Sequence, residues 1–435
     1  MAKGNSFVCD SCGFESGKWY GKCPNCGAWA SIVEFRESRV KTSGAKKKAR
    51  ELQPLSNAKS ESKKERTGIS ELDNALGDGL VPGQVILLAG EPGIGKSTLL
   101  LELAGKIRSA VYISGEESVV QIKHRADRMK ADFDSLLVLD ETNVDTVLAT
   151  LHSELKKNKF KIVFIDSIQT MYTEDLSSVP GSIGQVREAT FRLIDFAKKN
   201  GVPVILVGHV TKGGTVAGPA TLAHMVDTVL WFEGDKVNDV RILRSIKNRF
   251  GSTDEVGVFK MTASGLASSL DTETLFLDSS SPKNVPGTVI SCAMEGTRPF
   301  LIEVQSLVVP TKLAIPRRVV HGIDSRKAEL IIAVLTRHCG LNLSERDIFL
   351  NIVGGIKIKD PGTDLAVALA IASSYKNKPI KVSTVAFGEI GLLGEIRESV
   401  RETKRIERAR KQGYKNVVSS QSSKFLSQAL KITLG

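Results

Sequence analysis

The stretch that decides the fold reads Gly90-Glu91-Pro92-Gly93-Ile94-Gly95-Lys96-Ser97-Thr98. It fits the phosphate-binding pattern G-x-x-x-x-G-K-[ST]. The apolar run at 85–89 predicts a strand before it, and the leucine-rich run at 98–104 predicts a helix after it. Glycines let backbone N–H groups turn toward phosphate oxygens, and the helix N-terminus adds a favourable dipole. The alternative is a glycine turn that happens to precede a helix. We expect all nine residues to bind the phosphates of a nucleoside triphosphate.

Three side chains are candidates for contact with the phosphates and a magnesium ion. Lys96 is expected to reach the β- and γ-phosphates, and the Ser97 hydroxyl is expected to bind Mg²⁺. Asp166 closes the apolar run at 162–166, which is the Walker B arrangement. Because ligands of such sheets bind at the carboxyl ends of the strands, we expect Asp166 to hold Mg²⁺ through water.

Two further strand ends carry groups suited to the chemistry of hydrolysis. Glu116 and Glu117 follow the apolar run at 110–114, and we favour Glu116 as the residue that orients the attacking water. Alternatively, the two acids only stabilise the dipole of the next helix. His209 ends another apolar run and is either a sensor of the γ-phosphate or a structural histidine.

The region after Thr67 alternates between apolar runs and helical patterns. Such alternation predicts an α/β fold in which helices cover both faces of a mainly parallel sheet. The expected strands are 85–89, 110–114, 136–140, 162–166, 202–210 and 229–232, and the expected helices are 118–130, 144–157 and 183–199. Two segments that contain glycine, 173–185 and 211–219, follow strand ends. They are either connecting loops or loops that grip DNA phosphates.

The N-terminal 36 residues contain two C-x-x-C-G knuckles, formed by Cys9 with Cys12 and by Cys23 with Cys26. Two such knuckles provide four thiolates for a tetrahedral Zn²⁺ site, and a closed Cys₄ site is structural. A pair of redox dithiols or disulfides is the alternative. A segment this short cannot hold a core alone, so metal would supply most of its folding energy. We therefore predict a zinc ribbon.

Composition narrows the classes of partner. The chain has 435 residues and a net charge of +12, which favours a polyanion, nucleic acid before membrane. There is no run of ~18 apolar residues and no secretory segment at the N-terminus, so we expect a cytoplasmic protein without a membrane partner. Residues 37–66 are basic, rich in serine and without apolar periodicity, which predicts a flexible linker.

A specific resemblance emerges from motifs that occur together. Besides the knuckles and the phosphate loop, the chain contains Lys247-Asn248-Arg249-Phe250-Gly251, Asn284-Val285-Pro286-Gly287 and Met294-Glu295-Gly296-Thr297-Arg298-Pro299. The chain thus resembles, over its whole length, the RadA (Sms) family of bacterial DNA repair proteins, which have a RecA-like core. The K-N-R-F-G string discriminates best, because phosphate loops occur in many unrelated families. Without the resemblance this string is a basic turn between strands.

The resemblance implies an ATPase that binds single-stranded and branched DNA and promotes branch migration in recombinational repair. It also implies a homo-oligomeric ring, which we expect to be a hexamer. This ring is expected to work with a RecA-type recombinase filament. In such oligomers, cations at the positions of Lys247 and Arg249 reach the ATP of the neighbouring subunit. A cation supplied by a neighbour stabilises the charge of the transition state and links hydrolysis to assembly.

The C-terminal part resembles the Lon protease domain through Gly388-Glu389-Ile390-Gly391-Leu392-Leu393-Gly394-Glu395-Ile396. Proteolysis of the Lon type requires a serine activated by a lysine. Here no serine stands in the corresponding nucleophile segment, residues 359–366, where Thr363 or Asp364 takes its place, and Lys404 lies near the lysine position. A Thr–Lys dyad is conceivable, but we expect an α+β domain without proteolytic activity.

We therefore expect a zinc ribbon at 1–36, a linker at 37–66, a RecA-like ATPase at 67–271 and a Lon-protease-like domain at 272–435. The expected activity is DNA-dependent hydrolysis of ATP, with Mg²⁺ and Zn²⁺ as cofactors. The alternatives are an ATP-dependent protease and a non-enzymatic scaffold in which ATP only locks an oligomer.

The zinc hypothesis makes a direct prediction. Metal analysis of the purified full-length chain should give about one Zn²⁺ per chain, because one Cys₄ set binds one ion. Replacing Cys9 and Cys23 by serine should remove that ion. A folded N-terminal segment without metal would contradict the prediction.

Overall fold

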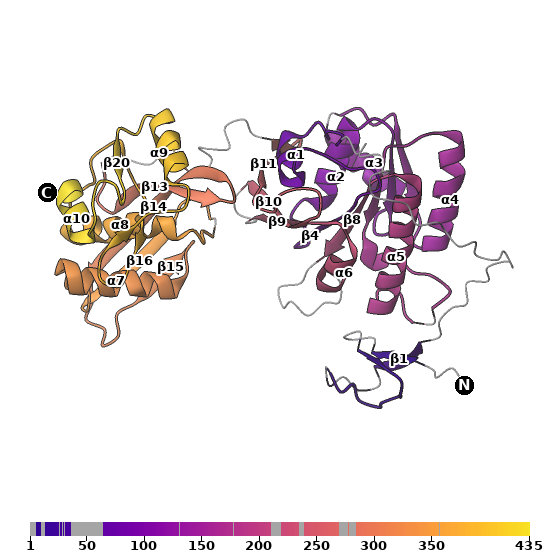
Figure 1. Ribbon diagram of the computed structural model, residues 1–435, viewed down its shortest axis with the longest axis horizontal. Coiled ribbons are helices and arrows are strands. Elements are labelled where there is room, and N and C mark those ends of the chain that lie inside the picture. Colours follow the sequence, from indigo (N-terminus) through magenta and orange to yellow (C-terminus); the bar gives the residue numbers. More distant parts are fainter. Residues whose placement is uncertain are drawn as a thin grey trace, which may run out of the picture. The chain divides into compact units, whose positions relative to one another are not determined.

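The computed structural model describes residues 6–9, 14–25, 27, 29, 31–35, 64–129, 131–176, 178–209, 219–234, 239–268, 277, 284–355 and 357–435. The chain divides into two compact units (Figure 1). The first comprises Met1–Glu233, Arg241–Thr253 and Met261–Ala267, and the second comprises Gly234–Val240, Asp254–Lys260 and Ser268–Gly435. Two short segments that precede residue 268 thus belong to the second unit.

Near the N-terminus, three short strands form a small antiparallel sheet of order β2-β1-β3. These strands are β1 (Ser6–Cys9), β2 (Glu15–Ser16) and β3 (Ile32–Phe35). Cys9, Cys23 and Ile32 are buried together, with Phe7 and Phe14 packed against them. Among the described residues, the buried part of this cluster consists of these three side chains, and apolar burial of that extent does little by itself to stabilise a domain.

The largest sheet has nine strands in the order β12-β11-β10-β9-β4-β8-β7-β5-β6. Six neighbouring strands, from β9 to β6, run parallel to one another. The strands are β4 (Val85–Gly90), β5 (Ala110–Ser114), β6 (Leu136–Asp140), β7 (Ile162–Asp166), β8 (Val204–His209), β9 (Thr228–Gly234), β10 (Val240–Asn248), β11 (Val256–Thr262) and β12 (Gly265–Ser268). Every strand expected from the apolar runs between 85 and 232 is present, within two residues at the ends that the structure describes.

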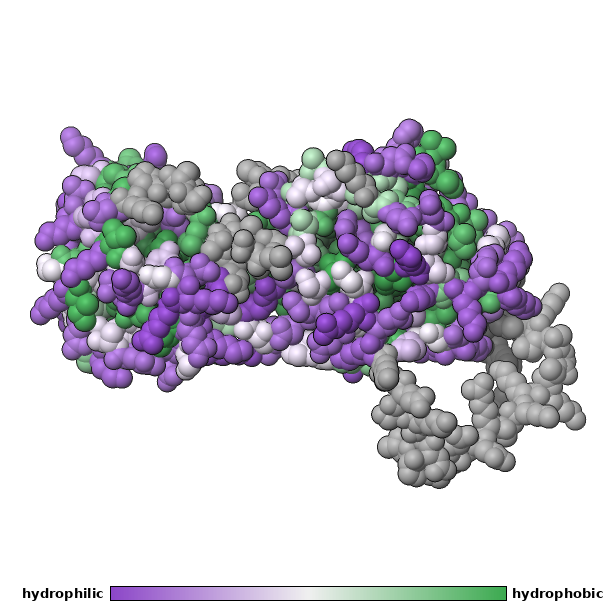
Figure 2. Space-filling model, turned by 90° about the horizontal axis from the view of Figure 1, so that it is seen from above, coloured by the Kyte–Doolittle hydropathy of each residue, from purple (hydrophilic) through white to green (hydrophobic). Residues whose placement is uncertain are grey.

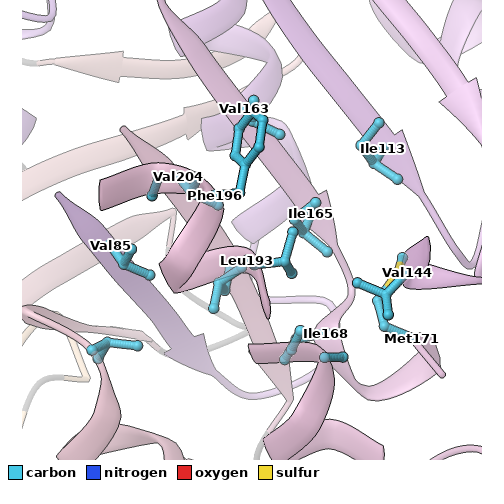
Figure 3. Close-up of a cluster of buried hydrophobic side chains, with 14 of the residues drawn as sticks. Val85, Ile113, Val144, Val163, Ile165, Ile168, Met171, Leu193, Phe196 and Val204 are labelled. Atoms are coloured by element: carbon cyan, nitrogen blue, oxygen red, sulfur yellow. The ribbon is translucent and has the colours of Figure 1, made fainter. Parts of the chain in front are cut away.

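Helices cover both faces of this sheet, as Figure 1 shows. They are α1 (Ser70–Leu76), α2 (Lys96–Lys106), α3 (Val119–Arg128), α4 (Val144–Lys157), α5 (Ile183–Asn200) and α6 (Pro219–Met225), and a 3₁₀ turn, η2 (Ile168–Thr170), follows β7. One face packs Val85, Ile113 and Val163 against Val144 of α4 and Leu193 of α5 (Figure 3). The alternate strand residues are also buried, so the opposite face, on the side of α2, is covered as well.

The second unit contains a six-stranded mixed sheet of order β15-β16-β14-β13-β17-β20 and a two-stranded ribbon, β18 with β19. Its strands are β13 (Thr288–Glu295), β14 (Arg298–Pro310), β15 (Arg318–His321), β16 (Arg346–Ile352), β17 (Thr384–Ala386), β18 (Glu389–Ile390), β19 (Ile396–Arg397) and β20 (Asn416–Val418). Its helical segments are α7 (Ser325–Cys339), η4 (Pro361–Thr363), α8 (Asp364–Lys376), α9 (Glu402–Lys411) and α10 (Leu426–Leu434). The fold of this unit is α+β, as expected.

One expected strand is too long. The apolar pattern of 347–358 predicts a single strand, but β16 ends at Ile352. Gly354 and Gly355 follow with positive φ values of 91° and 65°, which turn the chain out of the sheet.

The face drawn in Figure 2 is mainly hydrophilic, and apolar residues occur on it in small, separate patches. None of the helices in the described part of the chain has the length and apolar character that crossing a bilayer requires.

Candidate nucleotide-binding site

The phosphate-binding loop lies at the carboxyl end of β4, between that strand and α2. β4 is buried along its whole length and ends at Gly90, and α2 begins at Lys96. Gly93 and Gly95 have φ values of 76° and 114°, a region that side chains disfavour. A Cβ atom at Gly90 would collide with the carbonyl oxygen of Phe232 on β9. The loop therefore needs its glycines both for backbone conformation and for close packing.

Lys96 occupies the centre of the loop. Its ammonium group donates to the carbonyl oxygens of Gly90 and Glu91, at 2.9 Å each, and the residue is almost completely buried. Burial lowers the pKa of Lys96 to about 8, although the nearby carboxylates of Asp166 and Glu116 act in the opposite direction. The charged form of a buried lysine is stabilised when an anionic phosphate binds beside it. This effect agrees with the expected contact between Lys96 and the β- and γ-phosphates.

Asp166 lies at the end of β7, close to Lys96, and is buried. The Tyr112 hydroxyl on β5 donates to its Oδ2 atom. Burial and the neighbouring Asp166 raise the pKa of Tyr112 well above its usual value, so the phenol stays protonated as a donor. The sequence did not single out Tyr112. Only the parallel register of β5 with β7, which pairs Tyr112 with Phe164, places it beside the carboxylate.

Glu116, in the segment after β5, lies near Lys96. The Ser167 hydroxyl donates to its Oε1 atom at 2.6 Å, and Nε2 of His209 lies 3.1 Å from the same oxygen. The pKa of Glu116 is lowered to about 2, first by His209 and also by Ser167 and Lys96, against the opposing effect of burial. Glu116 is therefore a carboxylate at any working pH. Ser167 was another residue that the sequence did not indicate.

Glu117 has a different environment from Glu116. Its carboxylate forms an ion pair with Arg125 of α3, and its carbonyl oxygen accepts from the Ser114 hydroxyl. Glu117 thus pairs with a residue in the last turn of α3, whereas Glu116 lies near Lys96 of the loop.

The groups around Lys96 fit a magnesium ion with a triphosphate. Ser97 and Thr98 lie in the first turn of α2 and are half-buried, and Asp166 supplies a buried carboxylate. Hydroxyl and carboxylate oxygens are the hard donors that Mg²⁺ prefers, and Mg²⁺ commonly keeps waters between itself and such carboxylates. Glu91, Pro92 and Gly93 are exposed at the top of the loop.

The structure does not place Lys247 and Arg249 near the phosphate loop of the same chain. Arg249 N–H donates to the carbonyl oxygen of Asp227 at 3.2 Å, so the end of β10 lies beside the start of β9. Asp227 N–H in turn donates to the carbonyl oxygen of Val85, the first residue of β4. The phosphate loop begins at the other end of β4, about 17 Å away at the usual rise per residue. The two cations therefore lie at the opposite edge of the sheet from the loop of the same chain.

A buried carboxylate organises this opposite edge. Asp227 accepts from the Val85 N–H at 3.0 Å, pairs with Lys198 and lies 3.3 Å from Nη1 of Arg249. Lys247 instead donates to the carbonyl oxygens of Ala223, His224 and Val226, at 2.6, 3.3 and 2.8 Å. Burial lowers the pKa of Lys247. The Lys247 ammonium is thus engaged at the end of α6, whereas the Arg249 side chain is more than half exposed.

The remaining residues of the K-N-R-F-G string are structural in their contacts. The Asn248 side chain donates to Leu76 at the end of α1 and accepts from the Phe250 N–H. Gly251 packs directly against Gly77, where a Cβ would be tight. This string therefore fixes the end of β10 against α1.

In the second unit, the nucleophile segment of the Lon-like region offers no serine–lysine pair. The Thr363 hydroxyl is buried and donates to the Asp360 carbonyl oxygen, and Lys404 is exposed. Arg405 is completely buried, and its guanidinium makes two hydrogen bonds to the Asp360 carboxylate, at 2.6 and 2.9 Å. Asp364 pairs with Lys327 at 2.8 Å, and burial raises its pKa to about 6. This arrangement fixes the segment and provides no activated nucleophile.

Of the four expected zinc ligands, Cys9 and Cys23 are described, and Cys12 and Cys26 lie outside the described residues. Cys9 and Cys23 are buried in one cluster, and the Cys9 thiol lies 3.2 Å from the Ser31 hydroxyl. The described residues contain no group of three His, Cys, Asp or Glu side chains arranged to hold a metal ion. Two thiols that share a cluster fit half of a Cys₄ set.

Comparisons with known proteins agree with this geometry. Family models described as KaiC, an ATPase, as rubredoxin metal binding domain and as subunit ChlI of Mg-chelatase match residues 65–255, 7–34 and 314–423. The DNA repair protein RadA of Bacillus subtilis (strain 168) is 44% identical over 433 residues, which cover 96% of this chain and 93% of that protein. RadA of Aquifex aeolicus (strain VF5) is 44% identical over 421 residues, with 96% and 93% covered. RadA of Listeria monocytogenes is 45% identical over 419 residues, with 94% and 91% covered.

The fold and the phosphate loop define a RecA-like, KaiC-type P-loop ATPase with an N-terminal zinc ribbon, an enzyme that hydrolyses ATP. The chain belongs to the RadA family of DNA repair proteins.

The contact between His209 and Glu116 predicts a change in pH dependence. The substitution His209→Ala removes the largest cause of the low pKa of Glu116, so this pKa should rise from about 2 toward the ordinary range of a glutamate side chain. A proton would then inactivate Glu116 at a higher pH, and the acid limb of the ATPase pH–rate profile should move upward. His124→Ala, at an exposed position on α3, is the matched control. An acid limb of H209A that coincides with that of the unsubstituted protein would show that His209 does not act through Glu116.

Proposed function

We propose that this chain is an ATPase dependent on single-stranded DNA, which assembles into a ring and drives branch migration of recombination intermediates. In the proposed ring, each ATP lies between two subunits, and the neighbour supplies Arg249 and Lys247. The observation that carries this proposal is the position of these two cations at the edge of the sheet remote from their own phosphate loop.

A cation helps hydrolysis only if it reaches the transferred phosphoryl group. Asp227 contacts both Arg249 and Val85, the first residue of β4. Because the phosphate loop follows the other end of β4, Arg249 lies away from the ATP of its own chain. Its exposed side chain is available to a second copy that presents its phosphate loop to this edge. Because Lys247 is held by three carbonyl oxygens, Arg249 is the more available of the two, and Lys247 fixes the end of α6.

The remaining roles follow from the contacts at the loop. Lys96 binds the β- and γ-phosphates, with Gly90 to Thr98 as the cradle, and Ser97 and Asp166 hold Mg²⁺, which neutralises charge on the phosphate oxygens. Glu116, kept ionised by His209 and Ser167, accepts a hydrogen bond from the attacking water and orients it. Each of these assignments is a proposal that substitution can test.

DNA as the partner is supported by the net charge of +12 and by the names of the relatives, which are DNA repair proteins. We infer that single-stranded and branched DNA bind this chain, that a RecA-type filament is its protein partner and that it works in the cytoplasm. The second candidate DNA loop, 211–219, lies outside the described residues except for Pro219. The match to a rubredoxin metal binding domain supports Zn²⁺ at the four cysteines.

We also propose the domain division at 1–36, 37–66, 67–271 and 272–435. The C-terminal domain is non-proteolytic in this proposal, because Thr363, Asp364 and Lys404 do not form a dyad. It contributes to assembly and to DNA contact. Of the basic residues in this domain, Arg318 donates to three backbone carbonyl oxygens and Lys327 pairs with Asp364, whereas Arg317 is exposed.

The test is ATP hydrolysis by the purified chain with and without single-stranded DNA, over a series of salt concentrations. Turnover should rise with DNA, and the stimulation should fade as salt increases, because phosphate contacts release counterions. Lys96→Ala should abolish turnover under all conditions. Turnover that is indifferent to DNA would contradict DNA dependence and leave the ATPase in place, and turnover retained by K96A would contradict the site itself.

A further inference from the structure

One side chain from a distant part of the sequence reaches into the phosphate loop. Arg241, the second residue of β10, is buried, with 6% of its surface exposed. Its Nε–H donates to the backbone carbonyl oxygen of Ile94 at 3.1 Å. Ile94 lies between the two glycines of the loop that have positive φ values, Gly93 and Gly95. No motif in the sequence includes Arg241, and none of the roles assigned above uses it.

The direction of this carbonyl group determines what the next N–H group can do. In a trans peptide the C=O and N–H bonds point in opposite directions. If the Ile94 oxygen is held toward Arg241 and the sheet, the N–H of Gly95 must point away from them, which is the orientation that a cradle of backbone N–H groups requires. Gly95 forms the C-terminal side of this peptide and already has a positive φ value, so its backbone offers little resistance to a flip of the peptide plane.

Arg241 differs from the other cation that contacts the carbonyl groups of this loop. Lys96 donates to the oxygens of Gly90 and Glu91, but its proposed role is to turn to the phosphates when ATP binds. Arg241 is anchored on a strand that lies between β9 and β11 in the sheet. It can therefore hold the loop when Lys96 is engaged elsewhere. Its guanidinium also adds positive potential beside the phosphate site.

We propose that Arg241 is a positioning residue that holds the Ile94–Gly95 peptide in the orientation that binds phosphate. The inference rests on the proposed ATP site. It concerns nucleotide affinity and does not depend on DNA binding or on the ring.

The test compares two substitutions on the same strand. Arg241→Met keeps much of the apolar stem and removes the donor. Arg244→Met is the matched control, because Arg244 lies three residues further along β10 and pairs with Glu233, a residue without a role in the site. Equilibrium binding of a fluorescent ADP analogue and the KM and kcat for ATP are measured for both variants, together with thermal unfolding.

We expect R241M to weaken nucleotide binding and to raise KM by roughly tenfold or more, the loss typical of a hydrogen bond from a charged group. R244M should bind nucleotide as the unsubstituted protein does. Unchanged affinity of R241M, or an equal loss in R241M and R244M, would overturn the proposal.

Two further measurements keep the outcome decisive. If R241M does not fold, Arg241→Leu replaces it, measured below its unfolding temperature, because leucine also lacks a donor; R241L with full affinity would then overturn the proposal. K96A separates the inference from the site on which it rests. If K96A binds and hydrolyses ATP normally, the proposed site is wrong. If K96A fails and R241M is normal, only the role of Arg241 is wrong.

Discussion

A triphosphate carries several negative charges, and the protein meets them with backbone N–H groups that must all point into one loop. This requirement places strong constraints on the first unit. It places glycine where the backbone turns and where Phe232 approaches, and it puts the loop at the carboxyl end of a buried strand, ahead of a helix N-terminus. The carbonyl groups of the same peptides must point outward, and Lys96 and Arg241 supply donors for three of them.

The parallel sheet then separates two kinds of charged residue. At the carboxyl edge, Asp166 and Glu116 gather around Lys96, and each is fixed by a hydroxyl group, from Tyr112 and Ser167. At the amino edge, the buried Asp227 carboxylate collects Lys198, Arg249 and the Val85 N–H. A buried carboxylate without partners would be strongly destabilising, so these contacts are part of what holds the edge together. They also place Arg249 at the surface, where a second copy can use it.

The sequence predicted those features that are determined by residues close together along the chain. The phosphate loop, the strand that ends at Asp166 and the helix at 144–157 depend on local patterns, and the structure has them at the expected positions. Tyr112, Ser167, Asp227 and Arg241 were not predicted, because their roles arise from contacts across strands or between distant segments. Arg241 and Ile94 are 147 residues apart. The end of β16 at Ile352 was missed because apolar residues continue beyond the glycine turn that ends the strand.

The central claim is that each ATP site is completed by Arg249 of a neighbouring subunit. The most direct measurement uses mixed oligomers of two inactive variants, K96A and R249A, co-expressed with different tags and purified through both. If equal amounts of the two variants are incorporated at random, about a quarter of the sites combine an intact Lys96 with an intact Arg249 of the neighbour. Turnover with single-stranded DNA should therefore reach about a quarter of that of the unsubstituted protein. A mixture no more active than the two variants measured separately would contradict the claim and return Arg249 to a structural role beside Asp227.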